Sequence, residues 1–132
     1  MKLTRASSYA LHAMAHIVSL KQSVPIASHH IAEARGIPER FLLKVLRPLV
    51  DARILKSVKG PSGGYILVRP AAELTVLDIL EAVDGPMRGQ TPFDKLDDDS
   101  TFNHKMEKIC IQVADVTRKH LEKVKLTELA VK

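Results

Sequence analysis

Residues 56–69 read Lys-Ser-Val-Lys-Gly-Pro-Ser-Gly-Gly-Tyr-Ile-Leu-Val-Arg, and this stretch decides the fold that the whole sequence predicts. The segment 60–64 consists of turn residues, and its glycines can adopt backbone angles that other residues avoid. Residues 56–59 and 65–68 on either side are strand-like, the second run being aromatic and rich in branched side chains. The stretch therefore predicts a β-hairpin with cations at its base. It is either an ordinary exposed hairpin or a wing laid against nucleic acid.

Two short helices are predicted directly before the hairpin. The first covers 28–35 and ends at Gly36, which is placed to adopt the left-handed conformation that closes helices. The second covers 38–51, begins with Pro38 in its first turn, and should be kinked by Pro48. Two helices joined by a tight glycine turn, the second one cationic, are typical of a helix-turn-helix. Followed at once by a hairpin, they predict a winged helix.

The remaining helices complete a mainly α fold with a small β-hairpin. Thr4 can cap a helix that reaches about Lys21, and Thr75 can cap a helix over 74–83. Breakers such as Gly89 and Pro92 predict a loop after Met87. The sequence thus divides into a winged helix-turn-helix DNA-binding domain over 1–84, a loop over 85–100, and a dimerisation helix with a C-terminal tail over 101–132.

A long amphipathic helix is predicted over 101–125. Its apolar residues recur at spacings of three and four, which is nearly a heptad seam. The domain before it does not need so long a helix for its own core, so we expect the seam to pair with a second copy; the alternative is that it folds back on its own domain. The predicted dimerisation residues are Phe102, Met106, Ile109, Val113, Val116, Leu121 and Val124.

Charge is unevenly spread along the 132 residues. Residues 1–70 carry eleven Lys or Arg against three acids, whereas residues 71–132 carry nine against twelve. A cationic first half is typical of a module that binds a polyanion. No run approaches the roughly 20 apolar residues that cross a bilayer, and no secretory leader is evident. The single cysteine, Cys110, excludes an internal disulfide. We therefore expect a cytoplasmic protein without a membrane partner.

Enzymatic and metal sites find little support in the sequence. No nucleophile and base, no paired carboxylates outside 97–99 and no phosphate-binding loop can be recognised. His12 and His16 have the spacing of metal ligands but lack the glutamate of a metalloprotease, and we interpret them as ordinary histidines. His104 and Cys110, with an aspartate from 97–99, are the remaining weak candidates. A packed or idle cysteine is the simpler interpretation of Cys110.

Several motifs together resemble the Rrf2 family of bacterial winged-helix regulators over nearly the whole chain. They are the start at 3–10, Ile-Ala-Glu at 31–33, Gly-Ile-Pro at 36–38, Phe-Leu at 41–42, Ser-Val-Lys-Gly-Pro-Ser-Gly-Gly-Tyr at 57–65, the stretch 78–83 and the tail 121–129. The resemblance implies a homodimer crossed through the long helix, operator DNA read by two recognition helices and two wings, and effector sensing beside the long helix. Many members hold an iron–sulfur cluster through three cysteines, which the single Cys110 excludes here.

We thus expect a dimeric, sequence-specific regulator of transcription, acting as a repressor on a palindromic operator of double-stranded DNA, without a predicted cofactor and with an unknown effector. A winged-helix protein-interaction module and a redox- or metal-responsive regulator that uses Cys110 remain alternatives. Leu43 stands where some members place a base-reading acid, and Arg53 where glycine is usual. The predicted DNA-binding residues are Lys2, Arg5, Ser7, Tyr9, Ser28, Glu39, Arg40, Lys44, Lys56, Ser57, Lys59, Gly60, Pro61, Ser62, Gly63, Gly64 and Tyr65.

Overall fold

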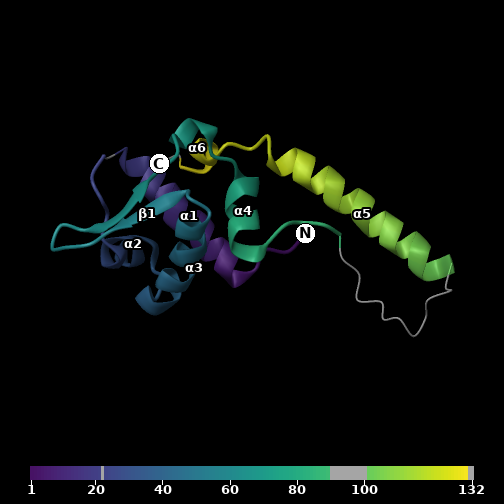
Figure 1. Cartoon of the computed structure of the whole chain (residues 1–132), viewed down its shortest axis with the longest axis horizontal. Helices are drawn as coiled ribbons and strands as arrows, with labels where there is room; N and C mark the ends of the chain where they lie inside the picture. Colours follow the sequence, from purple (N-terminus) through teal and green to yellow (C-terminus); the bar gives the residue numbers. More distant parts are fainter. Residues whose placement is uncertain (22, 90–100, 131–132) are drawn as a thin grey trace.

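The computed structural model describes residues 1–21, 23–89 and 101–130. Helices dominate it, and the two strands form one antiparallel hairpin (Figure 1). This is the mainly α winged-helix fold that the sequence predicts. In chain order the elements are α1 (Arg5–Leu20), α2 (Ser28–Arg35), α3 (Glu39–Asp51), β1 (Leu55–Val58), β2 (Gly64–Leu67), η1 (Ala71–Glu73), α4 (Val76–Asp84), α5 (Thr101–Leu121) and α6 (Leu126–Leu129).

The core lies around α1, which packs against α2, α3, α4 and α6. Met14 of α1, Leu46 of α3 and Ile79 of α4 are among its fully buried side chains. Thr4 caps α1 as predicted, because its hydroxyl accepts the backbone N–H of Ser7. The apolar faces of α1, α3 and α4 therefore share one interior.

The helix-turn-helix forms where the sequence predicts it. Gly36 ends α2 in the left-handed conformation, at φ +63°, and the Ile37 N–H donates to the Ala32 carbonyl. Pro38 lies immediately before α3 as its N-cap residue, one position earlier than the predicted first turn. Pro48 lies inside α3. The turn fixes α2 and α3 in contact with one another.

The hairpin begins and ends one residue earlier than predicted, with Leu55 facing Leu67 and Val58 facing Gly64. It does not stand alone. Ile26, in the segment before α2, exchanges both backbone hydrogen bonds with Tyr65, at 2.9 Å each. A Cβ at Gly64 would lie 2.3 Å from the Ile26 carbonyl oxygen, so only glycine permits this approach. The wing is therefore fastened to the helix-turn-helix at its base.

The fourth helix starts at Val76 rather than at the predicted position 74. Thr75 and Asp78 form a reciprocal capping box, each side chain accepting the other residue's backbone N–H. Leu74 stays extended, fully buried, and its carbonyl accepts the N–H of Leu126. A short 3-10 turn, η1, precedes it and was not predicted.

The C-terminal part differs most from the sequence-based prediction. The long helix α5 ends at Leu121 instead of 125, and the chain then turns back so that α6 packs against α1. Leu126 is completely buried in the core of the domain. Figure 1 shows α5 reaching away from the helix-turn-helix and the hairpin, while α6 lies at the domain, in contact with α1 and η1. The tail is therefore part of the winged-helix core as well as the end of the long helix.

Candidate nucleic-acid interface

The exposed face of α3 carries Arg40, Lys44 and Arg47, while Leu42, Val45, Leu46 and Leu49 are buried beneath it. The buried side chains fix the helix against α1, which directs the cations outward. Arg40 holds its guanidinium carbon 4.8 Å from the centre of the Phe41 ring, and the Lys44 ammonium lies 5.7 Å from the same centre. This is the geometry of a helix that presents positive charge to a groove.

The start of α3 is linked to the start of α2. The Ser28 hydroxyl donates to the Glu39 carboxylate at 3.2 Å. These two predicted DNA-binding residues therefore lie side by side, next to the cations of α3. One carboxylate oxygen of Glu39 thus accepts a hydrogen bond from Ser28.

The wing divides into an exposed tip and a fastened base. Lys56, Ser57 and Lys59 are exposed, as are the residues of the tip at 60–62. Gly63, Gly64 and Tyr65 are only half exposed, and Tyr65 packs against the core as well as pairing with Ile26. Of the predicted wing residues, those from 56 to 62 are thus the ones that a ligand can reach freely.

Fewer of the predicted DNA-binding residues at the start of α1 are accessible than expected. Lys2 and Arg5 are exposed, and Tyr9 is half-buried against the core. Ser7, however, is completely buried, and its hydroxyl donates to the Asp84 carboxylate, which also accepts the Thr4 hydroxyl at 3.1 Å. Ser7 is therefore not available to a phosphate in this structure. The anion that the N-terminus of α1 attracts is a carboxylate of the chain itself.

Three exposed residues near this face were missed by the sequence analysis as candidates. Arg47 continues the cationic face of α3 one turn beyond Lys44 and could have been found from helical spacing alone. His29 and His30 lie at the start of α2, with ring centres 4.2 Å apart. Nothing in their sequence position distinguished them from other exposed histidines.

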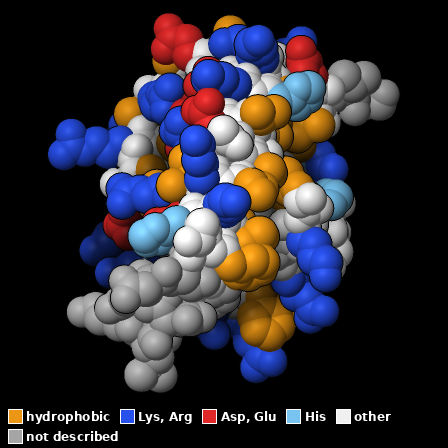
Figure 2. All heavy atoms as spheres, turned by 90° about the vertical axis from the view of Figure 1, so that its right-hand side faces the viewer, with side chains coloured by type: hydrophobic (Ala, Val, Ile, Leu, Met, Phe, Trp, Pro, Cys, Tyr) orange, Lys and Arg blue, Asp and Glu red, His pale blue; other side chains and the backbone are white. Residues whose placement is uncertain are grey.

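A second surface runs along α5. Phe102, Ile109, Val113 and Val116 are between 49% and 68% exposed, although all are large apolar side chains. Figure 2 views the molecule from the side of this helix and shows a band of apolar side chains with Lys and Arg on both sides. Met106 and Leu121 are both half-buried, and Leu121 is the last residue of the helix. Val124 lies beyond the helix, with its carbonyl bonded to Val76, so it does not continue the seam.

One carboxylate joins α4 to α5 and to the segment that leads away from α4. Glu81 accepts two hydrogen bonds from Arg118, at 2.9 and 3.0 Å, and one from the Met87 backbone, at 2.8 Å. The hydrogen bonds from Arg118 lower the pKa of Glu81. A Cβ at Gly89 would lie 2.4 Å from the Cys110 carbonyl oxygen, so this segment also presses against α5. The chain from α4 to position 89 thus holds the long helix in contact with the domain.

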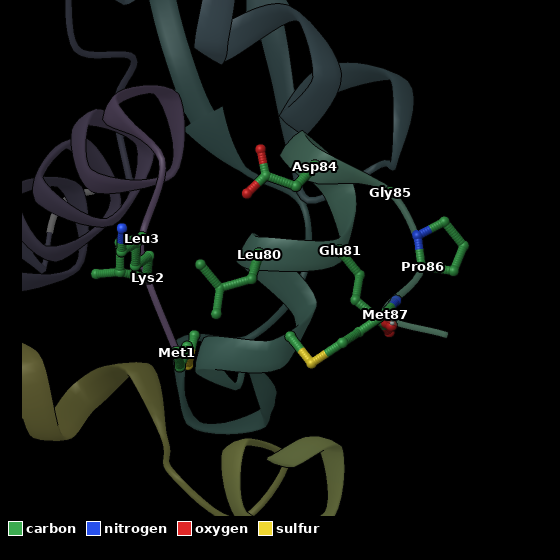
Figure 3. Close-up of a pocket in the computed structure, with 9 residues that line it drawn as sticks. All are labelled: Met1, Lys2, Leu3, Leu80, Glu81, Asp84, Gly85, Pro86 and Met87. Carbon is green, nitrogen blue, oxygen red and sulfur yellow. Dashed lines mark hydrogen bonds between the residues drawn. The ribbon is translucent and has the colours of Figure 1, made fainter. Parts of the chain in front are cut away.

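A small pocket of about 190 Å³ is lined in part by Glu81 and Met87 (Figure 3). Leu80 of α4 and the side chains of Met1 and Met87 provide apolar walls, and Asp84 lies at one end. Both carboxylates near it, Glu81 and Asp84, already accept hydrogen bonds from the chain.

The candidate metal ligands do not converge. His104 is exposed and Cys110 half-buried on α5, and six residues along a helix separate two side chains by roughly 120° in direction and about 9 Å in height. Residues 97–99 lie outside the described residues. Across the part of the chain that the structure describes, no three His, Cys, Asp or Glu side chains gather as a metal site. Burial and the nearby charge of Arg35 lower the pKa of His16.

Comparison with known proteins places these surfaces in context. The family model Rrf2, described as an iron-dependent transcriptional regulator, matches residues 3–132. A protein of Mycobacterium tuberculosis (strain ATCC 25618 / H37Rv) is 33% identical over 87 residues, which is 66% of this chain and 54% of that protein. The chain therefore spans about half the length of that relative.

A fuller match is the HTH-type transcriptional regulator CymR of Bacillus subtilis (strain 168), 26% identical over 98% of this chain and 90% of CymR. The solved structure of CymR, described as the global cysteine regulator of that organism, matches with a TM-score of 0.76 at 25% identity. The match covers 98% of this chain and 96% of the CymR chain.

Across residues 1–21, 23–89 and 101–130, no helix has the length and apolar character needed to cross a bilayer.

Proposed function

The chain belongs to the Rrf2 family of transcriptional regulators, and we propose that it acts as a homodimer that binds a palindromic DNA operator through α3 and the wing. The family is one of regulators and not of enzymes. The fold it shares with CymR is the one that presents a recognition helix and a hairpin together.

The observation that carries DNA binding is a set of cations that have no acidic partner among residues 1–21, 23–89 and 101–130. The ion pairs of the described residues join Arg69 to Asp78, Arg118 to Glu81 and Lys119 to Asp115. The exposed cations of α3 take part in none of them, and neither do Lys56 and Lys59 of the wing. A surface cation left unpaired beside another cation is stabilised when it meets a phosphate, and the released counterions drive the association. Lys2 and Arg5, also exposed and unpaired in the described part, extend this surface.

We assign base contacts to Arg40 and its neighbours Glu39 and Lys44, and groove or backbone contacts to the wing residues from 56 to 62. Arginine pairs with guanine through two parallel hydrogen bonds, and lysine in a wing contacts phosphate or a narrow minor groove. The polar contacts of a dimer recur on two half-sites, so the operator is expected to be a palindrome.

Dimerisation is supported by the apolar band on α5. Large apolar side chains that remain about half exposed or more along one helix face are stabilised by burial against a second helix. Ile109→Glu should convert the dimer to a monomer in analytical ultracentrifugation. Ile111→Glu is the matched control, because Ile111 is equally exposed, at 49%, but points to the opposite side of α5. A stable dimer in both variants would place the interface elsewhere.

No three-cysteine cluster is proposed, although the family model is described as iron-dependent. The chain has one cysteine, and the His104 and Cys110 positions point in different directions on α5. The effector is therefore left unassigned, and a redox- or metal-responsive mechanism through Cys110 stays an alternative. Ultraviolet–visible absorption and metal analysis of anaerobically purified protein test it directly, since a bound cluster would give absorption in the visible range.

The decisive experiment is selection of bound fragments from a genomic library, followed by footprinting. We expect retained fragments with two inverted half-sites about one helical turn apart, and an affinity that falls steeply with salt. If the dimer retains no fragment, the scaffold serves instead as a protein-interaction module. A reporter placed behind a selected operator tests repression, which we expect because a dimer seated on the operator blocks access to the promoter. We propose that this occurs in the cytoplasm, where a bacterial chromosome lies.

A further inference from the structure

We propose that Phe41 is a positioning residue for DNA recognition, whose ring holds Arg40 and Lys44 in place before the DNA arrives. This inference rests on the proposed function, because it concerns how the same helix face reads its operator. Phe41 has no polar atom, and two cations lie beside its ring.

The geometry places both cations on one ring. The guanidinium carbon of Arg40 lies 4.8 Å from the ring centre and the Lys44 ammonium lies 5.7 Å from it, both within the roughly 6 Å range of a cation–π contact. The ring itself is half-buried, whereas both cations are exposed. A half-buried ring therefore lies beside two cations that face solvent.

No acid competes for these cations in the described part of the chain. The neighbouring Glu39 is hydrogen-bonded to Ser28, and the ion pairs present involve other residues. Long side chains lose rotamer freedom when they are ordered on binding. The negative face of the ring attracts both charges and reduces this ordering cost.

The two distances suggest a division of roles. A flat guanidinium can lie on a ring and still keep the N–H groups of its edge free for the O6 and N7 atoms of guanine. Lys44 lies near the outer limit of the contact, on a flexible stem, and is the better candidate for a phosphate. We therefore expect Phe41 to act mainly through Arg40, and to change sequence selectivity more than total affinity.

The test compares Phe41→Leu with Phe41→Tyr in binding to a selected operator and to a scrambled duplex. Leucine keeps an apolar side chain but removes the aromatic face, whereas tyrosine keeps the face. Contacts of this kind at exposed sites contribute roughly two- to fivefold each. We expect Phe41→Leu to weaken operator binding by about that factor, with unchanged binding to the scrambled duplex and an unchanged salt slope, because both charges remain. Phe41→Tyr should bind like the wild type.

A double-mutant cycle tests whether Phe41 acts through Arg40. In an Arg40→Gln background, the effect of Phe41→Leu on operator binding should shrink toward none. The wild-type protein provides an independent signature: the δ-methylene protons of Arg40 should show an upfield ring-current shift by nuclear magnetic resonance in the absence of DNA. This measurement does not depend on whether the leucine variant folds.

Several outcomes overturn the inference. Equal operator affinity in Phe41→Leu and the wild type, an equal loss in Phe41→Tyr, or the absence of the Arg40 ring-current shift would each do so while leaving the proposed function intact. If the wild type itself prefers no fragment over the scrambled duplex, the proposed function fails first, and this inference fails with it.

Discussion

Replacing Leu126 by alanine should destabilise the whole winged-helix domain. The Leu126 side chain is completely buried in the core, although it follows a 21-residue helix that reaches away from that core. Removing a fully buried leucine side chain costs about 2–5 kcal/mol, through lost burial and the cavity that remains. A domain has roughly 5–15 kcal/mol of total stability, so Leu126→Ala should lower the denaturation midpoint by a large fraction.

Leu129→Ala is the matched control for this prediction. Leu129 lies in the same short helix but is 45% exposed, and a surface substitution usually changes stability by less than about 0.5 kcal/mol. Urea denaturation followed by circular dichroism, at one fixed protein concentration because a dimer's stability depends on it, separates the two variants. If Leu126→Ala and Leu129→Ala unfold at the same midpoint, α6 is not packed in the core as described.

Three further predictions follow from local contacts. The pKa of Glu81 is lowered in the folded protein, so its ionised form adds stability above the unfolded pKa of about 4.3, and this stability is lost as pH falls through the lower folded pKa. Glu81→Gln should therefore reduce the drop in the unfolding midpoint between about pH 7 and pH 3. An unchanged pH profile would contradict the Arg118 contact. Arg53 has φ +60°, so Arg53→Gly should raise the unfolding free energy by about 0.5–1 kcal/mol in a denaturation experiment. Arg53→Ala is the control, and it should not raise the unfolding free energy, because alanine keeps a Cβ. Lys59→Ala should lower the salt slope of operator binding by about one unit, and an unaffected slope would remove Lys59 from the phosphate contacts.

Local signals predicted most of the winged helix. Thr4 and Thr75 are residues that cap helices, and Gly36 is a residue that ends them, so the boundaries of α1 and α2 and the cap of α4 were readable from their neighbours. The hairpin was likewise visible as two strand-like runs around a glycine-rich turn. The positive φ of Arg53 agrees with the resemblance, which places glycine at this position, because a residue with a Cβ is strained there.

Long-range partners were not readable. Ser7 looks like a phosphate ligand at a helix start, but its partner Asp84 lies 77 residues away, and only the folded chain brings them together. Val124 continues the apolar pattern of α5 closely enough that the helix was predicted to reach 125, whereas the turn after Leu121 sends Leu126 back to the core. The contact of Arg40 with Phe41 was hidden for the opposite reason: adjacent residues on a helix do not usually share a face.

The attachment of α5 along its C-terminal half has a consequence for the proposed dimer. Glu81 and the segment to Gly89 hold one side of the helix, and the turn into α6 holds its C-terminal end through Val76 and Leu126. A helix fastened in this way cannot rotate freely against its own domain. Pairing two copies through the apolar band of α5 would therefore also fix the distance between the two α3 helices, and with it the spacing of the half-sites that the dimer accepts. A signal that loosens the Glu81 junction would relax this spacing without touching a single DNA-binding residue.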